Sequence, residues 1–501
     1  MVAKESKLGL VVAGLLLSIL MASMDNTIVV TAMGTIVGDL GGLENFVWVV
    51  SAYMVAEMAG MPIFGKLSDM YGRKRFFIFG LIVFMAGSAL CGTAETITQL
   101  SIYRAIQGIG GGALVPIAFT IMFDLFPPEK RGKMGGLFGA VFGLSSIFGP
   151  LLGAYITDHI SWHWVFYINL PLGILSLIFI VASYKESPVH QKQSIDWWGA
   201  VTLIGAVVCL MFALELGGQK YAWDSSVILS LFTGFAALFL LFLFVETKAK
   251  DPIISFSMFK NRLFAGSTLV GLFYGAAFMA ATVYIPIFVQ GVYGGSATNS
   301  GLILLPMMFG SVITAQVGGF LTTKMSYRNI MYVSGVILIG GFLLLSTITP
   351  DTSRALLTIY MVVVGLGVGF SFSVLSMAAI HPFGMEQRGS ATSTSNFIRS
   401  LGMTIGITIF GMIQRTDFKE GLEKAFSGMG PMPKGDSREF LSEQARAQIP
   451  APILEKITDA LSSSIVHTFT WALVPAGIAF LLIFILGKER MVINKGETFK
   501  Q

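Results

Sequence analysis

Residues 65–75 read Gly65-Lys-Leu-Ser-Asp-Met-Tyr-Gly-Arg-Lys-Arg75, a short polar segment between two apolar runs that are each long enough to cross a bilayer. We expect a cytoplasmic loop between two membrane helices, because the basic triplet at 73–75 carries the positive charge that keeps a loop on that side. Gly65 and Gly72 would let the chain turn sharply without a side-chain clash. Asp69 adds nothing to that topology rule, which makes it a candidate functional residue.

The composition is that of a chain embedded largely in lipid. Of the 501 residues, 54% are hydrophobic and 12% are charged, and the mean hydropathy is +0.75. The net charge of +5 lies mostly in short loops, where it fixes topology, so no nucleic-acid partner is expected. Cys91 and Cys209 fall inside apolar runs, which argues against a disulfide framework or a thiolate metal site. We predict an all-α polytopic protein of the cell membrane.

Fourteen apolar runs are long enough to form transmembrane helices. The predicted spans are 8–32, 43–64, 76–94, 98–122, 135–157, 164–184, 198–217, 226–246, 263–289, 298–321, 330–348, 354–379, 391–414 and 465–487. The loops expected inside are rich in lysine and arginine, whereas the short outer loops hold little besides Lys220 and Arg354, so both termini are predicted to be cytoplasmic. The segment 415–464 is predicted to be an extracellular loop.

An internal repeat follows from a single offset of 257 residues. The matched positions are Gly108 and Gly365, Gly110 and Gly367, Gly112 and Gly369, Glu129 and Glu386, Arg131 and Arg388, Gly132 and Gly389, and Gly149 and Gly406. The offset predicts two six-helix bundles, residues 1–190 and 256–501, with two inserted helices at 191–255. Paired repeats of this kind are typical of transporters that rock around a central site.

Several motifs resemble those of the fourteen-helix drug:proton antiporters of the major facilitator superfamily, the EmrB/QacA type. They are the G-x-L-x-D-x-x-G-R-K pattern at 65–74, Met24-Asp-Asn-Thr-Ile-Val-Val30, Arg104-Ala-Ile-Gln-Gly-Ile-Gly110, Gly149-Pro-Leu-Leu-Gly153, Trp162-His-Trp-Val-Phe-Tyr-Ile-Asn-Leu-Pro-Leu-Gly173, Asp196-Trp-Trp-Gly199 and Asn396-Phe-Ile-Arg399-Ser-Leu-Gly402. The sequence departs from the family pattern at Ser145 and Ala154, where glycine is usual, and at His163, where arginine is usual.

The resemblance implies the major facilitator fold and multidrug efflux, in which lipophilic and often cationic drugs are exported in exchange for protons. It implies a monomer whose partners are small-molecule substrates, protons and the lipid bilayer, with the proton gradient in place of a cofactor. An exporter or symporter of one endogenous metabolite, siderophore or lipid precursor is the alternative with the same fold. An enzyme is not expected, because the sequence offers no metal-spaced histidine cluster and no Ser/His/Asp or Cys/His set.

Asp25 in the first predicted helix and Arg104 in the fourth are candidates for proton coupling. At 1.5 Å of rise per residue both lie roughly 25–27 Å above the inner face. A charge inside the membrane is costly unless it pairs or faces water, so we expect the two side chains to pair. The opposite charge of Arg104 would favour the charged form of the carboxyl group and burial would favour the neutral form, so Asp25 could exchange a proton. The alternative is a structural pair that only holds two helices together.

Glu57 is a candidate for binding a cation or a second proton. It is predicted roughly 10 Å from the inner face, with no partner within one turn; alternatively it is neutral and hydrogen-bonded to the backbone, or faces a water-filled crevice. The resembled fold places the first helix of the second half at the centre, where aromatic and methionine side chains suit lipophilic cations. The further substrate-binding candidates are Phe273, Tyr274, Phe278, Tyr284, Met307, Met308 and Gln316, each with lipid or core contact as its alternative.

A conformational lock is predicted around the segment 65–75. The resembled fold places the start of the thirteenth helix, Ser390–Ser395, against this segment. A helix amino terminus carries free N–H groups and a partial positive charge, so we expect Asp69 to dock there while Arg73 bridges to Asp124. The predicted lock consists of Gly65, Asp69, Gly72, Arg73 and Asp124.

A hinge is predicted in the fifth helix at Gly149, Pro150 and Gly153. Proline removes one hydrogen bond of the helix and bends it, and a bend is a place where a gate can move. The alternative is a static kink that serves packing only.

Overall fold

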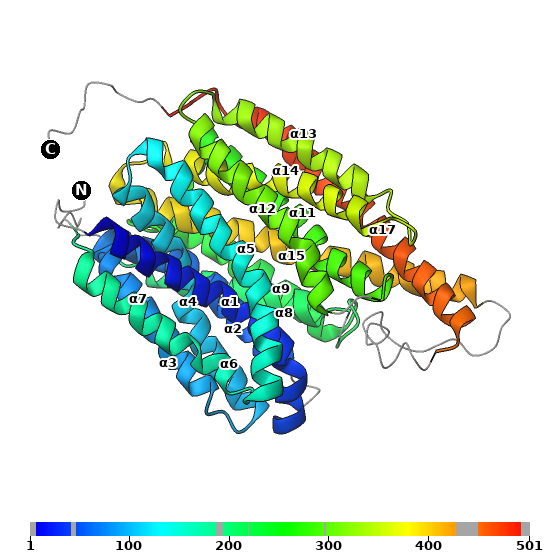
Figure 1. The fold of residues 1–501 in the computed structure, drawn as a ribbon. Coiled ribbons are helices and arrows are strands. Elements are labelled where there is room, and N and C mark those ends of the chain that lie inside the picture. The colour runs from blue at the N-terminus through cyan, green and yellow to red at the C-terminus, as the bar shows by residue number, and fades with distance from the viewer. Residues whose placement is uncertain are drawn as a thin grey trace.

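The computed structural model describes residues 7–41, 47–186, 194–218, 220–294, 297–426 and 449–491, and these residues are almost entirely helical (Figure 1). The helices are α1 (Leu8–Leu40), α2 (Val47–Tyr71), α3 (Arg73–Cys91), α4 (Ile97–Leu125), α5 (Pro128–His159), α6 (Trp164–Tyr167), α7 (Asn169–Ser183), α8 (Trp197–Leu216), α9 (Ser226–Lys248), α10 (Phe256–Phe259), α11 (Arg262–Gly291), α12 (Ala297–Leu321), α13 (Tyr327–Leu345), α14 (Arg354–Ile380), α15 (Arg388–Ala425) and α17 (Ala451–Leu482), with 3₁₀ turns η2 (Met385–Gln387) and η4 (Ile483–Ile485). In the described ranges the only β pairing is an isolated bridge between Gly217 and Tyr221. The predicted all-α class is confirmed.

Thirteen helices of the described chain are long and apolar enough to cross a membrane, one fewer than predicted. The predicted span 135–157 lies within α5, which is a continuous helix but has only the short apolar segment Phe148–Thr157. The first half of α5 contains charged residues and many glycines, which lower its hydropathy. With 32 residues, α5 is nevertheless about 48 Å long and could span a bilayer.

The same helix pairings occur in both halves of the molecule. In the first half α1 packs on α5 and α7, and α4 packs on α2 and α3. In the second half α11 packs on α15 and α17, and α14 packs on α12 and α13. Helices α11 to α15 are the counterparts of α1 to α5 at the offset of 257 residues, and α17 takes the place of α7 in the packing although it lies further along the chain than that offset. The arrangement is therefore the predicted pair of six-helix bundles, while the residue boundaries 190 and 255 stay predictions.

Glycines at repeat-related positions bring helices together in the same way in both bundles. A Cβ atom at Gly108 of α4 would collide with the carbonyl oxygen of Tyr53, and one at Gly365 of α14 would collide with that of Met307. Gly112 lies against the Glu57 carbonyl, as its counterpart Gly369 lies against that of Ser311. The repeated glycines thus serve backbone-to-backbone packing between membrane helices.

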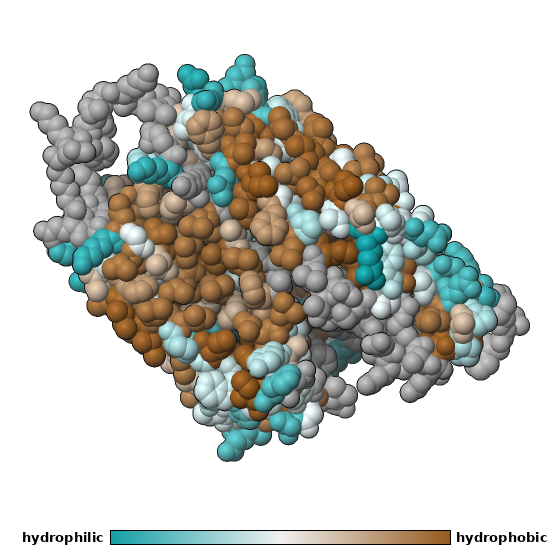
Figure 2. All heavy atoms as spheres, in the orientation of Figure 1, coloured by the Kyte–Doolittle hydropathy of each residue, from teal (hydrophilic) through white to brown (hydrophobic). Residues whose placement is uncertain are grey.

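The outer surface of the bundles is apolar. Figure 2 shows hydrophobic residues over the middle of the visible face and hydrophilic residues gathered toward its two ends. On α9 the exposed side chains include Leu240 at 65% and Phe244 at 61%. A soluble protein does not expose so much contiguous apolar surface, so this surface fits contact with lipid chains.

The segment 65–75 is not a loop. Helix α2 continues to Tyr71 and α3 starts at Arg73, so only Gly72 separates them. Gly72 has φ of 107°, a value that favours glycine, as predicted for one of the two turn glycines. Gly65 is helical, so its predicted role in turning the chain is wrong.

The predicted extracellular loop 415–464 is helical at both ends. Helix α15 continues to Ala425 and α17 starts at Ala451, and the two extend together beyond the neighbouring helices at one end of the molecule (Figure 1). Residues 427–448 lie outside the described ranges. Along α15 the buried residues Gln414, Phe418 and Leu422 recur every four positions, the spacing of one helix face. Hydropathy alone missed this extension because the opposite face is charged.

Candidate functional site

Asp25 and Arg104 form the predicted ion pair, and both side chains are completely buried. Asp25 Oδ2 contacts Arg104 Nη1, and Oδ1 accepts hydrogen bonds from Gln107 Nε2 at 2.8 Å and from Asn169 Nδ2 at 2.7 Å. The four residues come from α1, α4 and α7. The carboxylate therefore joins three helices of the first bundle.

A second set of polar groups holds these partners in place. Ser88 of α3 accepts hydrogen bonds from Gln107 at 3.1 Å and Asn169 at 2.9 Å, and donates one to the Phe166 carbonyl. Arg104 donates to the carbonyl of Val49 at 3.2 Å, and its guanidinium lies 4.2 Å from the ring centre of Tyr53. Sequence reasoning missed Gln107, Asn169 and Ser88. The signal for two of them was present, because Gln107 and Asn169 lie inside the quoted motifs.

The partners of Asp25 constrain what a proton could do there. Arg104, Gln107 and Asn169 all donate to the carboxylate. A protonated Asp25 would point its own hydrogen at one of these donors, so proton uptake requires at least one contact to break. Protonation and helix packing are thereby linked at this position.

Glu57 lies higher in α2 than predicted and has a partner on another helix. Because α2 runs to Tyr71, Glu57 is 14 residues above the helix end, about 21 Å rather than roughly 10 Å. Its side chain is hydrogen-bonded to Asn26 of α1 and is only partly buried. Glu57 is one helical turn from Tyr53, which stacks on Arg104, so it is close to the ion pair of the first bundle.

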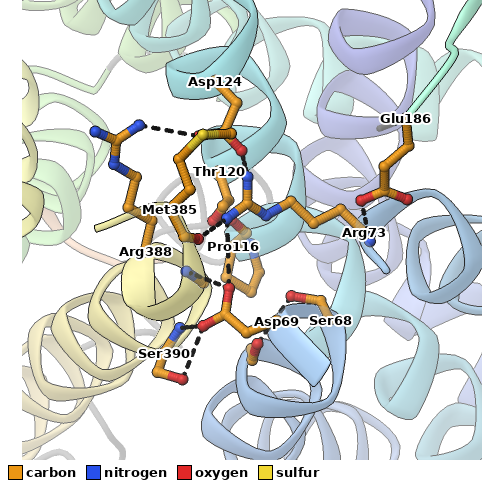
Figure 3. A network of polar contacts seen from close by, with 12 residues as sticks. Ser68, Asp69, Arg73, Pro116, Thr120, Asp124, Glu186, Met385, Arg388 and Ser390 are labelled. Carbon is orange, nitrogen blue, oxygen red and sulfur yellow. Dashed lines mark hydrogen bonds and ion pairs between the residues drawn. The ribbon is translucent and has the colours of Figure 1, made fainter. Parts of the chain in front are cut away.

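Asp69 docks on the amino terminus of α15. Its carboxylate accepts hydrogen bonds from the backbone N–H groups of Gly389 at 2.9 Å and Ser390 at 2.7 Å, and from Ser390 Oγ at 2.9 Å. These are the unpaired donors of the first helical turn, where the positive end of the helix dipole favours an anion. The predicted contact between the two bundles is present (Figure 3).

Two arginines and a second aspartate complete this contact. Arg73 pairs with Asp124 of α4, donates to the Met385 carbonyl at 2.6 Å and lies 3.4 Å from Asp69. Arg388 of α15 reaches Asp124 at 3.2 Å, so Asp124 receives a guanidinium from each bundle (Figure 3). We call Asp69, Arg73, Asp124 and Arg388 the interbundle lock. Sequence reasoning used Arg388 only to establish the repeat and missed its ion pair.

The two glycines of the predicted lock have different functions. Gly72 ends α2, and Glu186 accepts from the backbone N–H groups of Arg73 at 2.8 Å and Lys74 at 3.1 Å at the start of α3. Gly65 lies where α2 meets α15, and a Cβ atom there would collide with the side chain of Ser393. Gly65 therefore lets the bundles approach closely at the interbundle lock.

The predicted hinge residues lie where α5 packs on α1. Pro150 is inside a helix that continues without a break. Cβ atoms at Gly149 and Gly153 would collide with the hydroxyls of Thr27 and Thr31. Close packing alone accounts for both glycines, so a hinge here stays a prediction.

The structure divides the predicted substrate-binding residues into three groups. Phe273 and Phe278 of α11 are partly buried, like Glu57. Four others are buried in the helix core: Tyr274, Tyr284, Met307 and Met308. Tyr274, for example, points at Ser334 of α13, with the two hydroxyls 2.8 Å apart. Sequence could not separate these groups because α11 is apolar on all sides.

Gln316 is on the exposed stripe of α12. Phe309, Ile313 and Phe320 lie on the same stripe and are 62%, 57% and 53% exposed. The surrounding stripe is apolar. Met307 and Met308 are buried whereas Gln316 is exposed, so a shared site for the three residues stays a prediction.

Comparison with known proteins agrees with this architecture. The family model described as Major Facilitator Superfamily matches residues 15–407. "Multidrug resistance protein 3" of Bacillus subtilis (strain 168) is 59% identical over 505 residues, covering 99% of each chain. "Multidrug transporter protein MdtP" of the same organism is 40% identical over 484 residues, covering 93% of this chain and 90% of its own.

Solved structures with low sequence identity share the fold. The proton:xylose symporter XylE aligns with a TM-score of 0.62 at 12% identity, covering 96% of both chains. The human organic anion transporter MFSD10 aligns with a TM-score of 0.58 at 16% identity, covering 96% of this chain and 99% of its own. With the family match and the full-length relatives, they lead to one assignment: this chain belongs to the major facilitator superfamily.

Proposed function

We propose that this protein exports lipophilic, often cationic drugs in exchange for protons, as a multidrug efflux transporter of the fourteen-helix drug:proton antiporter type. The observation that carries the proposal is full-length similarity, at 59% identity, to a protein named for multidrug resistance. The buried pair of Asp25 and Arg104 supplies a group able to take up a proton inside the membrane. The proton gradient is the energy source, and the protein acts as a monomer with both termini in the cytoplasm.

Asp25 can couple proton uptake to helix packing because each hydrogen-bond partner described for its carboxylate is a donor. In the described state the carboxylate accepts from α4 and α7 and holds both against α1. A proton arriving on Asp25 removes its negative charge and weakens the attraction to Arg104. Substrate and proton then favour different packings of the first bundle, which is the requirement for exchange.

The interbundle lock supplies the conformational step. In the described state it closes the side that the basic loops predict to be cytoplasmic, with Asp69 seated on α15. Opening that side requires Asp69 to leave the helix terminus and Asp124 to give up Arg388. Alternating access is then a rocking of one bundle on the other around the site between them.

Everted membrane vesicles with an imposed pH gradient test the proposal. Accumulation of several chemically unrelated cationic dyes, abolished by a protonophore, is the expected result. Uptake of a single metabolite would instead indicate the alternative of a specific exporter or symporter. Asp25→Asn should abolish accumulation against the gradient with normal protein levels in the membrane, and retained accumulation would exclude Asp25 as the coupling group.

A further inference from the structure

Arg399 of α15 is a membrane-embedded cation without a counter-ion in the described part of the chain. Its Nη2 donates to the Ser371 carbonyl at 3.3 Å, and its guanidinium lies 5.5 Å from the ring centre of Phe372. The ion pairs inside the bundles and at their contact involve Asp25, Asp69 and Asp124, none of which reaches Arg399. A charge retained at this depth without a partner carries a cost that a purely structural side chain would avoid.

Asn396 adds a second unused donor next to Arg399. Its Nδ2 is buried and has no hydrogen-bond partner among the described residues. The two residues are three positions apart on α15, so they share a helix face. A guanidinium without a counter-ion and an amide N–H group without an acceptor match the oxygen atoms of a carboxylate.

Aromatic rings and small residues shape the space around Arg399. Phe278 and Phe372 meet edge to face with ring centres 5.9 Å apart, and both are partly buried, as Arg399 is. A Cβ atom at Gly271 of α11 would lie 3.8 Å from Arg399 Nε, so the side chain passes beside this glycine on its way from α15 to α14. A flat aromatic compound could lie on these rings with its acidic group at Arg399.

The first bundle carries a carboxyl group, that of Glu57, at a depth similar to that of the Arg399 guanidinium. Helices α2 and α15 touch at Asp69 with Ser390 and at Met58 with Thr404, 3.8 Å apart. Glu57 is 12 residues above Asp69, about 18 Å, and Arg399 is 9 residues beyond Ser390, about 14 Å. Counted from the contact between Asp69 and Ser390, Glu57 and Arg399 are offset by about 4 Å along the helices, and counted from the contact between Met58 and Thr404 by about 9 Å, a separation that one aromatic molecule can bridge.

Two buried side-chain amides without hydrogen-bond partners, those of Asn26 and Asn396, show the same difference between the bundles. In the first bundle Asn26 Oδ1 is a buried acceptor without a donor, next to the Glu57 carboxylate. In the second bundle Asn396 Nδ2 is a donor without an acceptor, next to Arg399. The amide next to Glu57 thus offers an acceptor and the amide next to Arg399 a donor, while unpartnered hydroxyls, which can act as either, occur in both bundles.

From this arrangement we propose that Arg399 and Asn396 bind the carboxylate of aromatic substrates whose cationic end is held by Glu57. The inference rests on the proposed efflux function and deepens it, since it assigns a substrate class, aromatic compounds that carry both charges, to a named site. Arg399 is then a specificity-determining residue that is separate from proton coupling at Asp25.

Two dyes that differ only at the acidic group test the assignment. Rhodamine 110 carries a free carboxyl group, and rhodamine 123 is its methyl ester with the same cationic ring system. In everted vesicles the wild type should accumulate both dyes. Arg399→Gln should raise the KM for rhodamine 110 about tenfold or more, the effect of losing a charged hydrogen bond, and leave that for rhodamine 123 unchanged. Arg399→Lys should restore part of the rhodamine 110 transport.

Arg415→Gln is the matched control. Arg415 is on the same helix and also donates only to backbone carbonyls in the contacts described, those of Gly411 at 3.1 Å and Gly218 at 3.4 Å. Its substitution should leave both dyes unaffected. An equal loss of both dyes in Arg399→Gln, or a wild type that accumulates rhodamine 123 but not rhodamine 110, would overturn the assignment while leaving efflux intact. A wild type that accumulates no cationic dye at all would refute the proposed function instead.

Discussion

The substitution Asp69→Asn tests the interbundle lock most directly. The carboxylate accepts three hydrogen bonds from Gly389 and Ser390, and its side chain is only 2% exposed. An asparagine has nearly the same shape but only one accepting oxygen. Its NH₂ group would face a backbone N–H donor of α15, so at least one contact is lost together with the negative charge.

The expected magnitude follows from two terms. A hydrogen bond to a charged group contributes about 1.5–3 kcal/mol, and an anion at a helix amino terminus contributes about 0.3–2 kcal/mol. Even a combined loss of about 2 kcal/mol would shift the equilibrium between the closed and open states roughly thirtyfold. The same loss leaves most of the folding stability of a bundle this size intact, because many other contacts join its helices.

A single reporter cysteine measures the shift. Cys91 and Cys209 are first replaced by serine, and Ser23 of α1, which is partly buried near the centre, is changed to cysteine. Labelling by a membrane-impermeant maleimide from the cytoplasmic side should be faster in Asp69→Asn, while drug transport falls and membrane levels stay normal.

Asp251→Asn is the control for this experiment, because Asp251 also accepts two hydrogen bonds, from Ser194 N at 2.8 Å and Ser194 Oγ at 2.9 Å, but lies outside the lock. Its labelling rate should equal that of the wild type. Lost transport with an unchanged labelling rate in Asp69→Asn would refute the lock.

Four further outcomes are expected. Arg104→Ala should leave the buried carboxylate of Asp25 without its counter-charge and abolish transport in neutral medium, measured by dye efflux at pH 7; retained efflux would contradict the coupling assignment. Gly365→Ala should lower the thermal unfolding temperature, because overpacking of this kind costs about 1–3 kcal/mol and the new methyl group would meet the Met307 carbonyl. Leu203→Asn in α8 should reduce expression without changing the range of dyes exported, and a changed range with normal expression would contradict this. Burial, opposed by Glu489, keeps the pKa of His381 below its ordinary value. Below about pH 6.5 the unfolded state therefore binds more protons than the folded state, and the stability of the wild type should fall. Unfolding temperatures at two pH values should show a smaller fall for His381→Gln.

Contacts that depend on depth or on a helix end could be predicted from sequence. Asp25 and Arg104 were matched by counting residues from the membrane face, and the Asp69 contact followed from the charge preference of a helix amino terminus. The first inference uses the 1.5 Å rise of a helix, and the second also needed the resembled fold, which places the start of the thirteenth predicted helix against residues 65–75. The ion pair between Arg388 and Asp124 connects two bundles, and nothing in the local sequence of either residue specifies its partner.

Contacts that depend on the rotation of a helix could not be predicted. In a membrane helix the lipid-facing and core-facing sides are both apolar, so periodicity does not distinguish them. This is why Tyr274 and Gln316 were assigned to the same site, although the first is in the core and the second is exposed. Hydropathy likewise missed the extension of α15 to Ala425, where one face is charged and the other buried.

The position of α8 limits how the two bundles can move. Its residues Leu203 and Val207 share an apolar cluster with Met58 of α2 and Phe397 of α15, so the inserted helix touches both bundles at once. When the bundles rotate against each other, α8 cannot remain fixed to both. The proposed rocking therefore requires one of the two α8 interfaces to slide. The side chains at these interfaces are apolar, so they can change neighbours without breaking hydrogen bonds. We therefore expect α8 to move with one bundle while its contacts with the other bundle are exchanged.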